Sequence, residues 1–396
     1  MIKLKPEIYQ PEALHSLKNM FLKKRIPHAL LIQTPGGVGE TELAEVIVNY
    51  LICEKPIEAL VPCNKCNSCL LQKSGSYPDY HEIKPKGLMR SIKVDDMTAM
   101  TKALYTTSMT GSAKIAVIEQ AETLRKETAN QFLKILEEPP EKTFFILMTT
   151  RHERLLPTIK SRCQSIRLKL LNNPTIMQLL KDYELSKEDQ EFITAISRGR
   201  YKKVEQLLDT IQEYKQLARI LSKILCHREN TLTMICELSS NFTGKLRELR
   251  KEFDKNSEAQ LKNKTAELKD LQPGVRNAVL SEIEEQLKSE QGEFERGQRA
   301  VFFDTLMELW RDILLLKHKN ESALIHKFLK SELKEAAQKY SEEEIMTALN
   351  DIEIVRGATV YLNARTDYVI PGLLVKNTSV VNENNLLRSA IISSLK

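Results

Sequence analysis

The chain has 396 residues, of which 42% are hydrophobic and 28% are charged, a balance typical of a globular protein with about two or three domains. No apolar run reaches the roughly 18 residues that a membrane-spanning helix needs, and the first residues lack the apolar core of a signal peptide, so we expect a cytoplasmic protein. The net charge of +6 is dispersed, which argues against an autonomous nucleic-acid-binding arm.

A glycine-rich turn, residues 33–42, is the first informative segment of the chain. It follows a helix expected over residues 11–24 and a buried strand, Ala29–Ile32, and it opens a second helix that ends near Cys53. This order is typical of a phosphate-binding loop, where backbone N–H groups surround phosphates, a Lys contacts the β/γ-phosphates and a Ser or Thr binds Mg²⁺. The residues that fit the pattern are Gly36, Gly37, Gly39 and Thr41.

Two residues of this turn depart from a working phosphate loop. Thr34 stands at the position of the first Gly, and Glu40 stands at the position of the Lys. A cation about 4 Å from a phosphate charge contributes roughly 4 kcal/mol at an effective dielectric constant near 20, and a carboxylate reverses the sign. The dipole of the following helix, about 0.3–2 kcal/mol, is too weak to compensate. We therefore expect a nucleotide fold that does not bind ATP; the alternative is an ordinary glycine-rich turn.

Four cysteines follow the second helix: Cys53, Cys63, Cys66 and Cys69. Four thiolates at such spacing close a tetrahedral zinc site and leave no open position for catalysis. In a reducing cytosol close cysteines indicate a metal rather than disulfides. The alternative is buried cysteines without a ligand, but three cysteines within seven residues of a polar loop do not build a hydrophobic core well. The sequence therefore predicts one structural zinc ion, in which Cys163, Cys226 and Cys236 take no part.

Further apolar runs predict strands that alternate with helices. The expected strands are Tyr80–Ile83, Lys114–Ile118, Phe144–Met148 and Gln164–Leu168, and helices are expected over residues 93–105 and 127–137. Alternation of this kind predicts an α/β fold, in which helices cover both faces of a parallel sheet.

The strand Lys114–Ile118 is followed by Glu119 and Gln120, where an ATPase with a phosphate loop would place Asp and Glu. The Asp would hold Mg²⁺ through water, and the Glu would polarise the attacking water. A neutral amide cannot accept a proton as a general base. We interpret Glu119 and Gln120 as a degenerate acidic pair.

The remaining residues, 211–396, have mostly helical patterns. An apolar stripe predicts a helix that packs into a core or a subunit interface; its members are Phe302, Leu306, Leu309, Trp310 and Ile313. Dense charges of both signs over residues 241–299 predict two long exposed helices joined at Pro273-Gly274. This hairpin is either a solvated extension or a docking element.

Several segments together resemble the clamp-loader branch of the AAA+ ATPases. They are Pro27-His28-Ala29, the four-cysteine module, Asn130–Pro140 (NQFLKILEEPP) and Leu156–Cys163 (LPTIKSRC). Within this branch, the degenerate loop and acidic pair resemble the delta prime family of bacterial DNA polymerase III rather than the gamma/tau motor subunits. The resemblance covers roughly residues 10–210.

The resemblance implies a P-loop NTPase-like AAA+ domain at residues 1–169, with the zinc module at 53–75. It implies a small helical lid at 170–210 and an all-α collar domain at 211–396, which carries the charged hairpin. The Arg that senses nucleotide in the lid of the family is Lys202 here, a further departure from an active site.

The resemblance also implies a function within DNA replication. The chain would be a nucleotide-inactive, stator-like subunit of the DNA polymerase III holoenzyme, with zinc and without ATP. Arg162 would act as an arginine finger for an adjacent ATPase subunit. The implied partners are the gamma/tau subunit, the delta subunit and, through the complex, the sliding clamp and primer-template DNA, with no membrane.

Other interpretations stay open. The chain could be an active clamp-loader ATPase of the gamma/tau type, against which Glu40, Glu119 and Gln120 argue. It could be a zinc-dependent nucleic-acid binder, against which the dispersed charge argues. Arg162 could be a surface residue paired with a carboxylate of its own domain.

Overall fold

The computed structural model describes residues 9–23, 26–85, 91–110, 112–226, 231–267, 273–361 and 370–374. The chain forms two compact units, Met1–Asp209 and Thr210–Lys396. None of the described helices combines the length and apolar character that crossing a membrane requires.

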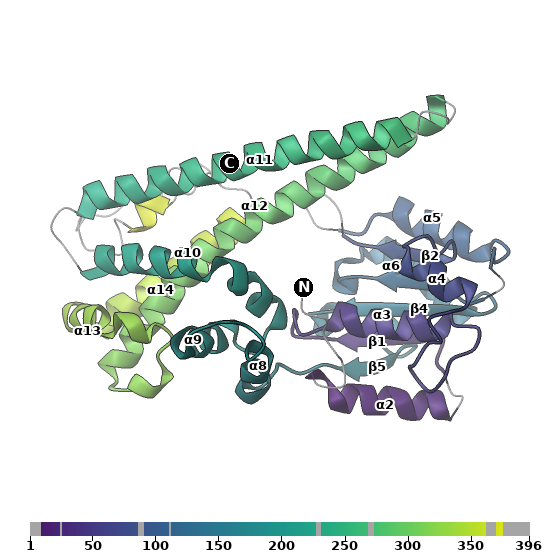
Figure 1. The fold of residues 1–396 in the computed structure, drawn as a ribbon, viewed down its shortest axis with the longest axis horizontal. Helices are drawn as coiled ribbons and strands as arrows, with labels where there is room; N and C mark the ends of the chain where they lie inside the picture. The colour runs from purple at the N-terminus through teal and green to yellow at the C-terminus, as the bar shows by residue number, and fades with distance from the viewer. Residues whose placement is uncertain are drawn as a thin grey trace. The chain divides into compact units, whose positions relative to one another are not determined.

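The first unit is built on a parallel sheet of five strands, in the order β2-β3-β4-β1-β5 (Figure 1). The strands are β1 (Ala29–Gln33), β2 (Tyr80–Ile83), β3 (Lys114–Ile118), β4 (Thr143–Thr149) and β5 (Gln164–Arg167). The predicted α/β fold with a parallel sheet is therefore confirmed.

Helices cover both faces of this sheet, because alternate residues of each strand point to opposite sides. On one face Leu30 and Ile32 of β1 share a core with the helices α2 (Pro11–Leu22) and α3 (Glu40–Leu51). On the other face Ala29 and Leu31 share a core with α5 (Val94–Tyr105), α6 (Lys126–Glu137) and α7 (Pro157–Lys160). This two-sided burial explains why the strands are apolar runs rather than alternating patterns.

Four further helical segments complete the first unit. They are α4 (Asn67–Lys73), α8 (Asn173–Leu180), α9 (Lys187–Ser197) and the start of α10 (Tyr201–Cys226), with short 3-10 turns η1 (Ala121–Thr123) and η2 (His152–Arg154). Asn172 and Ser186 cap α8 and α9 by accepting hydrogen bonds from backbone N–H groups at 2.9 and 3.1 Å.

The second unit is helical, as the sequence predicts. Its elements are the rest of α10, α11 (Thr231–Glu267), α12 (Pro273–Lys317), α13 (Lys330–Lys339) and α14 (Glu342–Tyr361), with 3-10 turns η3 (Glu321–Ala323) and η4 (Lys327–Leu329). The predicted apolar stripe lies on α12, and Trp310 packs edge-on against Tyr340 with ring centroids 4.8 Å apart. Trp310 is therefore a core residue.

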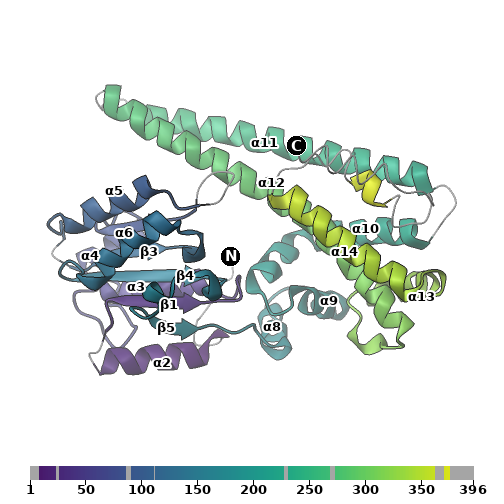
Figure 2. The same ribbon diagram turned by 180° about the vertical axis from the view of Figure 1, so that it is seen from behind.

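The charged hairpin differs from the prediction in its limits. Its two helices, α11 and α12, lie side by side (Figure 1 and Figure 2), but they begin at Thr231 and continue to Lys317 rather than covering residues 241–299. Pro273 and Gly274 open α12 instead of forming the turn, since Pro is tolerated in the first turn of a helix. The connection itself, residues 268–272, lies outside the described residues.

The base of the hairpin is part of the core of the second unit. Phe242 packs against Phe302 with ring centroids 4.9 Å apart, and Arg299 Nη1 donates to the carbonyl of Thr359 at 3.5 Å. Farther out, Phe253 stacks on Phe294 at 6.2 Å. Among the described side chains of residues 258–288, only Leu287 is buried.

We predict that replacing residues 258–288 by a short Gly/Ser joint leaves the second unit folded, because little apolar surface is lost. Thermal unfolding followed by circular dichroism should move by no more than about 2 °C. The matched comparison is Phe242→Ala at the base, which should cost up to about 3 kcal/mol of unfolding free energy. A truncation that destabilises more than Phe242→Ala would contradict this division of the hairpin.

Candidate functional site

The glycine-rich loop leaves the end of β1 and enters α3 at the carboxyl edge of the sheet. Gly36, Gly37 and Gly39 have φ angles of +86°, +71° and +96°, a left-handed conformation that residues with a Cβ rarely adopt. The N–H of Thr34 donates to the carbonyl of Thr149 at 3.0 Å, which fastens the start of the loop to β4. The predicted order of a strand, a glycine-rich turn and a helix is therefore present.

Three consecutive loop amides, those of Gly36, Gly37 and Val38, have acceptors within the chain. The Glu40 carboxylate accepts from the N–H of Gly37 at 2.7 Å and from the N–H of Val38 at 2.9 Å. The Thr34 hydroxyl accepts from the N–H of Gly36 at 3.0 Å and donates to Glu40 Oε2 at 3.3 Å. The two residues that depart from the phosphate-loop pattern thus provide the acceptors for consecutive loop N–H groups.

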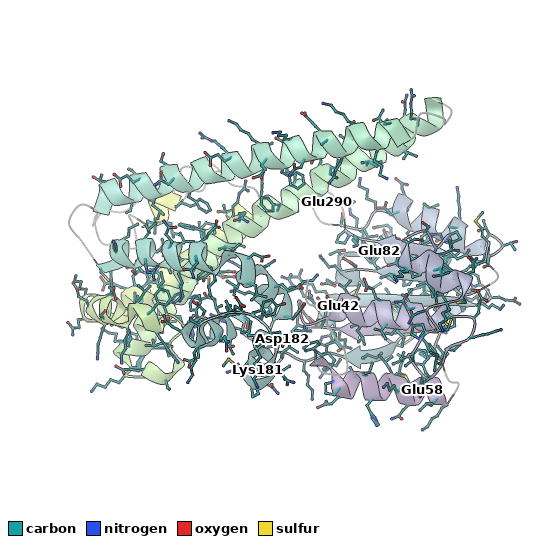
Figure 3. The ribbon with its side chains drawn as sticks, in the orientation of Figure 1. Glu42, Glu58, Glu82, Lys181, Asp182 and Glu290 are labelled. Carbon is teal, nitrogen blue, oxygen red and sulfur yellow. The ribbon has the colours of Figure 1, made fainter. Side chains whose placement is uncertain are left out.

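Glu119 and Gln120, which the sequence analysis interprets as a degenerate acidic pair, follow the end of β3. Lys84 Nζ lies 3.2 Å from Glu119 Oε1 and 3.2 Å from Oε2 of Glu82 on β2. Glu82 is labelled in Figure 3. Burial alone would lower the pKa of Lys84, but attraction to Glu119 and Glu82 raises it above its usual value. Glu119 and Glu82 therefore share one ammonium group. Gln120 has a left-handed backbone with φ of +47° and leads into η1.

Two residues that the sequence reasoning missed complete this edge of the sheet. The Glu122 carboxylate accepts from the hydroxyls of Thr149 and Thr150, both at 2.7 Å. Gln10 Nε2 donates to the carbonyl of Val38 in the loop at 3.3 Å and to that of Lys169 at 2.8 Å. Neither residue belongs to a spacing pattern, so no sequence signal was available to identify it.

Lys202 lies against the loop through its backbone. Its N–H donates to the carbonyl of Gly37 at 3.1 Å. A Cβ at Gly37 would lie 3.4 Å from Lys202 Cβ, so the two segments approach closely. Glu42 of α3, labelled in Figure 3, is also near: burial raises its pKa, and Lys202 partly offsets this effect.

The four predicted zinc ligands come together. The sulfur atoms of Cys53, Cys63, Cys66 and Cys69 all lie within 4.8 Å of one another. Zn–S bonds of about 2.3 Å in a tetrahedron require sulfurs roughly 3.8 Å apart, so the donor set fits zinc after a small contraction. Cysteines in unit 2, Cys226 and Cys236, and Cys163 of unit 1 lie outside the cluster.

The backbone around the cluster favours thiolates. The N–H of Cys63 donates to Cys53 Sγ at 3.2 Å, and the N–H of Cys66 donates to Cys63 Sγ at 3.3 Å. Hydrogen bonds from the N–H groups of Lys65 and Cys66 lower the pKa of the Cys63 thiol to about 6. Burial raises the pKa of the Cys53 and Cys69 thiols instead. Because metal ligation needs deprotonated sulfur, these two thiols would have to lose their protons when a cation binds.

Arg162 lies away from the glycine-rich loop. It follows α7 and precedes β5, whose first residue Gln164 pairs with Leu30 near the amino end of β1, while the loop leaves the carboxyl end at Gln33. Arg162 Nη2 lies 2.5 Å from Glu137 Oε1, and Nη1 donates to the carbonyl of Thr158 at 3.1 Å. The pairing that the sequence left open, with a carboxylate of its own domain, is therefore present in the isolated chain.

A match to a known family lies within the first unit. Residues 9–172 match the family model described as DNA polymerase III, delta subunit. A DNA polymerase III subunit delta' of Buchnera aphidicola subsp. Acyrthosiphon pisum is 31% identical over 195 residues, 49% of this chain and 58% of the relative. The subunit delta' of Escherichia coli K12 is 38% identical over 137 residues, 35% of this chain and 41% of the relative.

A gamma subunit is also similar to this chain. The DNA polymerase III subunit gamma of Buchnera aphidicola subsp. Schizaphis graminum is 32% identical over 232 residues, 58% of this chain and 61% of the relative. The chain thus spans between 41% and 61% of the length of these relatives. The predicted resemblance to the delta prime subunits of DNA polymerase III is confirmed by the family match and by the delta' relatives.

Proposed function

We propose that this chain is a nucleotide-inactive, AAA+-type subunit of a bacterial clamp loader, which lends Arg162 to the ATPase site of a neighbouring subunit. The resemblance to delta prime subunits supports the clamp-loader role in DNA polymerase III. In this proposal residues 1–169 form the AAA+ domain, residues 170–210 its helical lid and residues 211–396 the collar.

The lack of nucleotide binding is supported by the groups that fill the loop. The N–H groups of Gly37 and Val38, which would face a phosphate, donate to Glu40 at 2.7 and 2.9 Å. A phosphate would have to displace this carboxylate and then lie beside its negative charge. Glu119 is paired with Lys84, and Gln120 cannot act as a general base.

The observation that carries the trans-acting role is the position of Arg162 beyond the amino end of β5, whereas the loop lies at the carboxyl end of β1. Five strand residues span about 16 Å, farther than an arginine side chain reaches. Arg162 therefore serves no site formed by its own loop. Its side chain is 35% exposed, and its pair with the 51% exposed Glu137 is a surface ion pair, a class that contributes about 0–1 kcal/mol.

A phosphate group on a neighbouring subunit would compete well for Arg162. Guanidinium binds phosphate oxygens with two parallel hydrogen bonds, whereas Arg162 contacts only one oxygen of Glu137, Oε1. The partners in this proposal are the gamma/tau ATPase and the delta subunit. The sliding clamp and primer-template DNA are contacted through the complex.

An active ATPase of the gamma type is the second candidate, favoured by the similarity to the Buchnera gamma subunit. We predict instead that the isolated chain shows no saturable ATP binding up to about 1 mM, because Glu40 repels phosphate by several kcal/mol. Isothermal titration calorimetry with ATP measures the binding affinity. Glu40→Lys should raise the affinity, whereas Glu45→Lys, which makes the same charge change at an exposed position of α3, should not. Micromolar binding by the unmodified chain would support the second candidate.

We also predict one zinc ion per chain in protein prepared without chelators, measured by elemental analysis. Cys66→Ser should lose the metal and destabilise the first unit, since structural zinc sites contribute folding free energy directly. Cys236→Ser, at an exposed position of α11, is the matched control and should retain the zinc. Metal-free protein with unchanged stability would rule out a structural zinc site.

For Arg162 we predict that Arg162→Ala leaves folding, zinc content and ring assembly unchanged but lowers the DNA-stimulated ATPase of the reconstituted complex and its clamp loading. The single site that Arg162 serves should slow on the order of 10³-fold or more, by analogy with arginine fingers of GTPases. The control is Arg167→Ala, an exposed arginine at the carboxyl end of β5, the strand that follows Arg162. Wild-type loading rates with Arg162→Ala would show that the trans-acting role is wrong.

A further inference from the structure

The two departures from the phosphate-loop pattern are in contact with each other. Thr34 Oγ1 donates to Glu40 Oε2 at 3.3 Å, and together their side chains accept from the N–H groups of Gly36, Gly37 and Val38. Consecutive N–H groups that point toward one centre repel one another unless an acceptor lies between them. We propose that Thr34 and Glu40 form a built-in ligand of the loop, which holds the start of α10 against it without any bound nucleotide.

Three consecutive N–H groups of the loop, those of Gly36, Gly37 and Val38, have acceptors within the loop. Glu40 uses both carboxylate oxygens, Oε1 for Gly37 and Oε2 for Val38. The Thr34 hydroxyl acts as acceptor for Gly36 and as donor to Glu40, so its single proton and one of its lone pairs are both used. Val38 is fully buried and Thr34 is 7% exposed, whereas Glu40 is half-buried, so water has restricted access to these hydrogen bonds.

One peptide plane links the built-in ligand to α10. The N–H of Val38 and the carbonyl of Gly37 belong to the same planar peptide unit and point in opposite directions. Glu40 accepts from the N–H side at 2.9 Å, and the N–H of Lys202 donates to the carbonyl side at 3.1 Å. Because glycine allows rotation of this unit, the Glu40 contact fixes the direction in which the carbonyl of Gly37 points.

The hydrogen bond to the Gly37 carbonyl also provides an acceptor for an N–H group in the first turn of α10. The first N–H groups of a helix have no partner within the helix, and that of Lys202 is one of them because α10 begins at Tyr201. Its acceptor is a loop carbonyl that Glu40 orients. Glu40 is therefore a positioning residue for α10, acting through Gly37, and this role does not depend on whether Arg162 serves a neighbour.

Hydrogen–deuterium exchange on the full chain tests the coupling. Glu40→Ala should accelerate exchange about tenfold or more in peptides covering residues 36–42 and also in those covering residues 200–206, because hydrogen bonds to charged acceptors are lost. Glu40→Gln should give a smaller acceleration in both segments, since an amide offers one oxygen instead of two. Glu45→Ala removes an exposed carboxylate from the same helix and should change neither segment.

Faster exchange in the loop with unchanged exchange at residues 200–206 would disprove the link to α10. Unchanged exchange in both segments would disprove the built-in ligand. If Glu40→Ala fails to fold, the graded Glu40→Gln and the isosteric Thr34→Val decide. Thr34→Val must accelerate exchange in the loop peptide, since it removes the acceptor of the Gly36 N–H; a wild-type pattern in both variants overturns the proposal.

Discussion

Glu40 accepts hydrogen bonds from the N–H groups of Gly37 and Val38, and the ordering of the loop region depends on this contact. The loop adopts left-handed backbone at Gly36, Gly37 and Gly39, which brings its amides together. Such a concavity normally needs an anion from outside. Here the chain provides its own carboxylate at the first position of α3, where the helix dipole also favours negative charge. The N–H groups of Gly37 and Val38 therefore have an acceptor without a bound ligand.

Other polar groups along the carboxyl edge of the sheet also have partners within the chain. Lys84 pairs with Glu119 at 3.2 Å, and Glu122 binds the hydroxyls of Thr149 and Thr150. In a nucleotide site, groups at such positions would face Mg²⁺ or phosphate. Buried polar groups need partners, and this edge provides them from neighbouring strands. In the proposed nucleotide-inactive chain, these contacts would keep the shape of the edge without a bound nucleotide.

The parallel sheet separates this edge from the one that carries Arg162. All strands run in one direction, so the glycine-rich loop and Arg162 lie beyond opposite ends of β1 and β5. The arginine rests on Glu137 at the end of α6, and buried Ile159 packs α7 against the same core. In the proposed assembly this arrangement lets a chain without a working site of its own contribute to a site on its neighbour.

Local patterns in the sequence determined the parallel sheet, the loop, the cysteine cluster and the resemblance to delta prime subunits. Glycine spacing, cysteine spacing and apolar runs are short-range, so they were readable without a structure. The limits of the hairpin could not be predicted from the sequence, because one continuous helix, α12, contains both the charged part and the buried stripe around Trp310.

The partners of Glu119 and of the Gly37 carbonyl were decided only by the tertiary structure. Strand order β2-β3-β4-β1-β5 is not sequence order, and the contact of Gln10 with Lys169 joins residues 159 positions apart. Such contacts follow from how the elements pack, which no local pattern encodes.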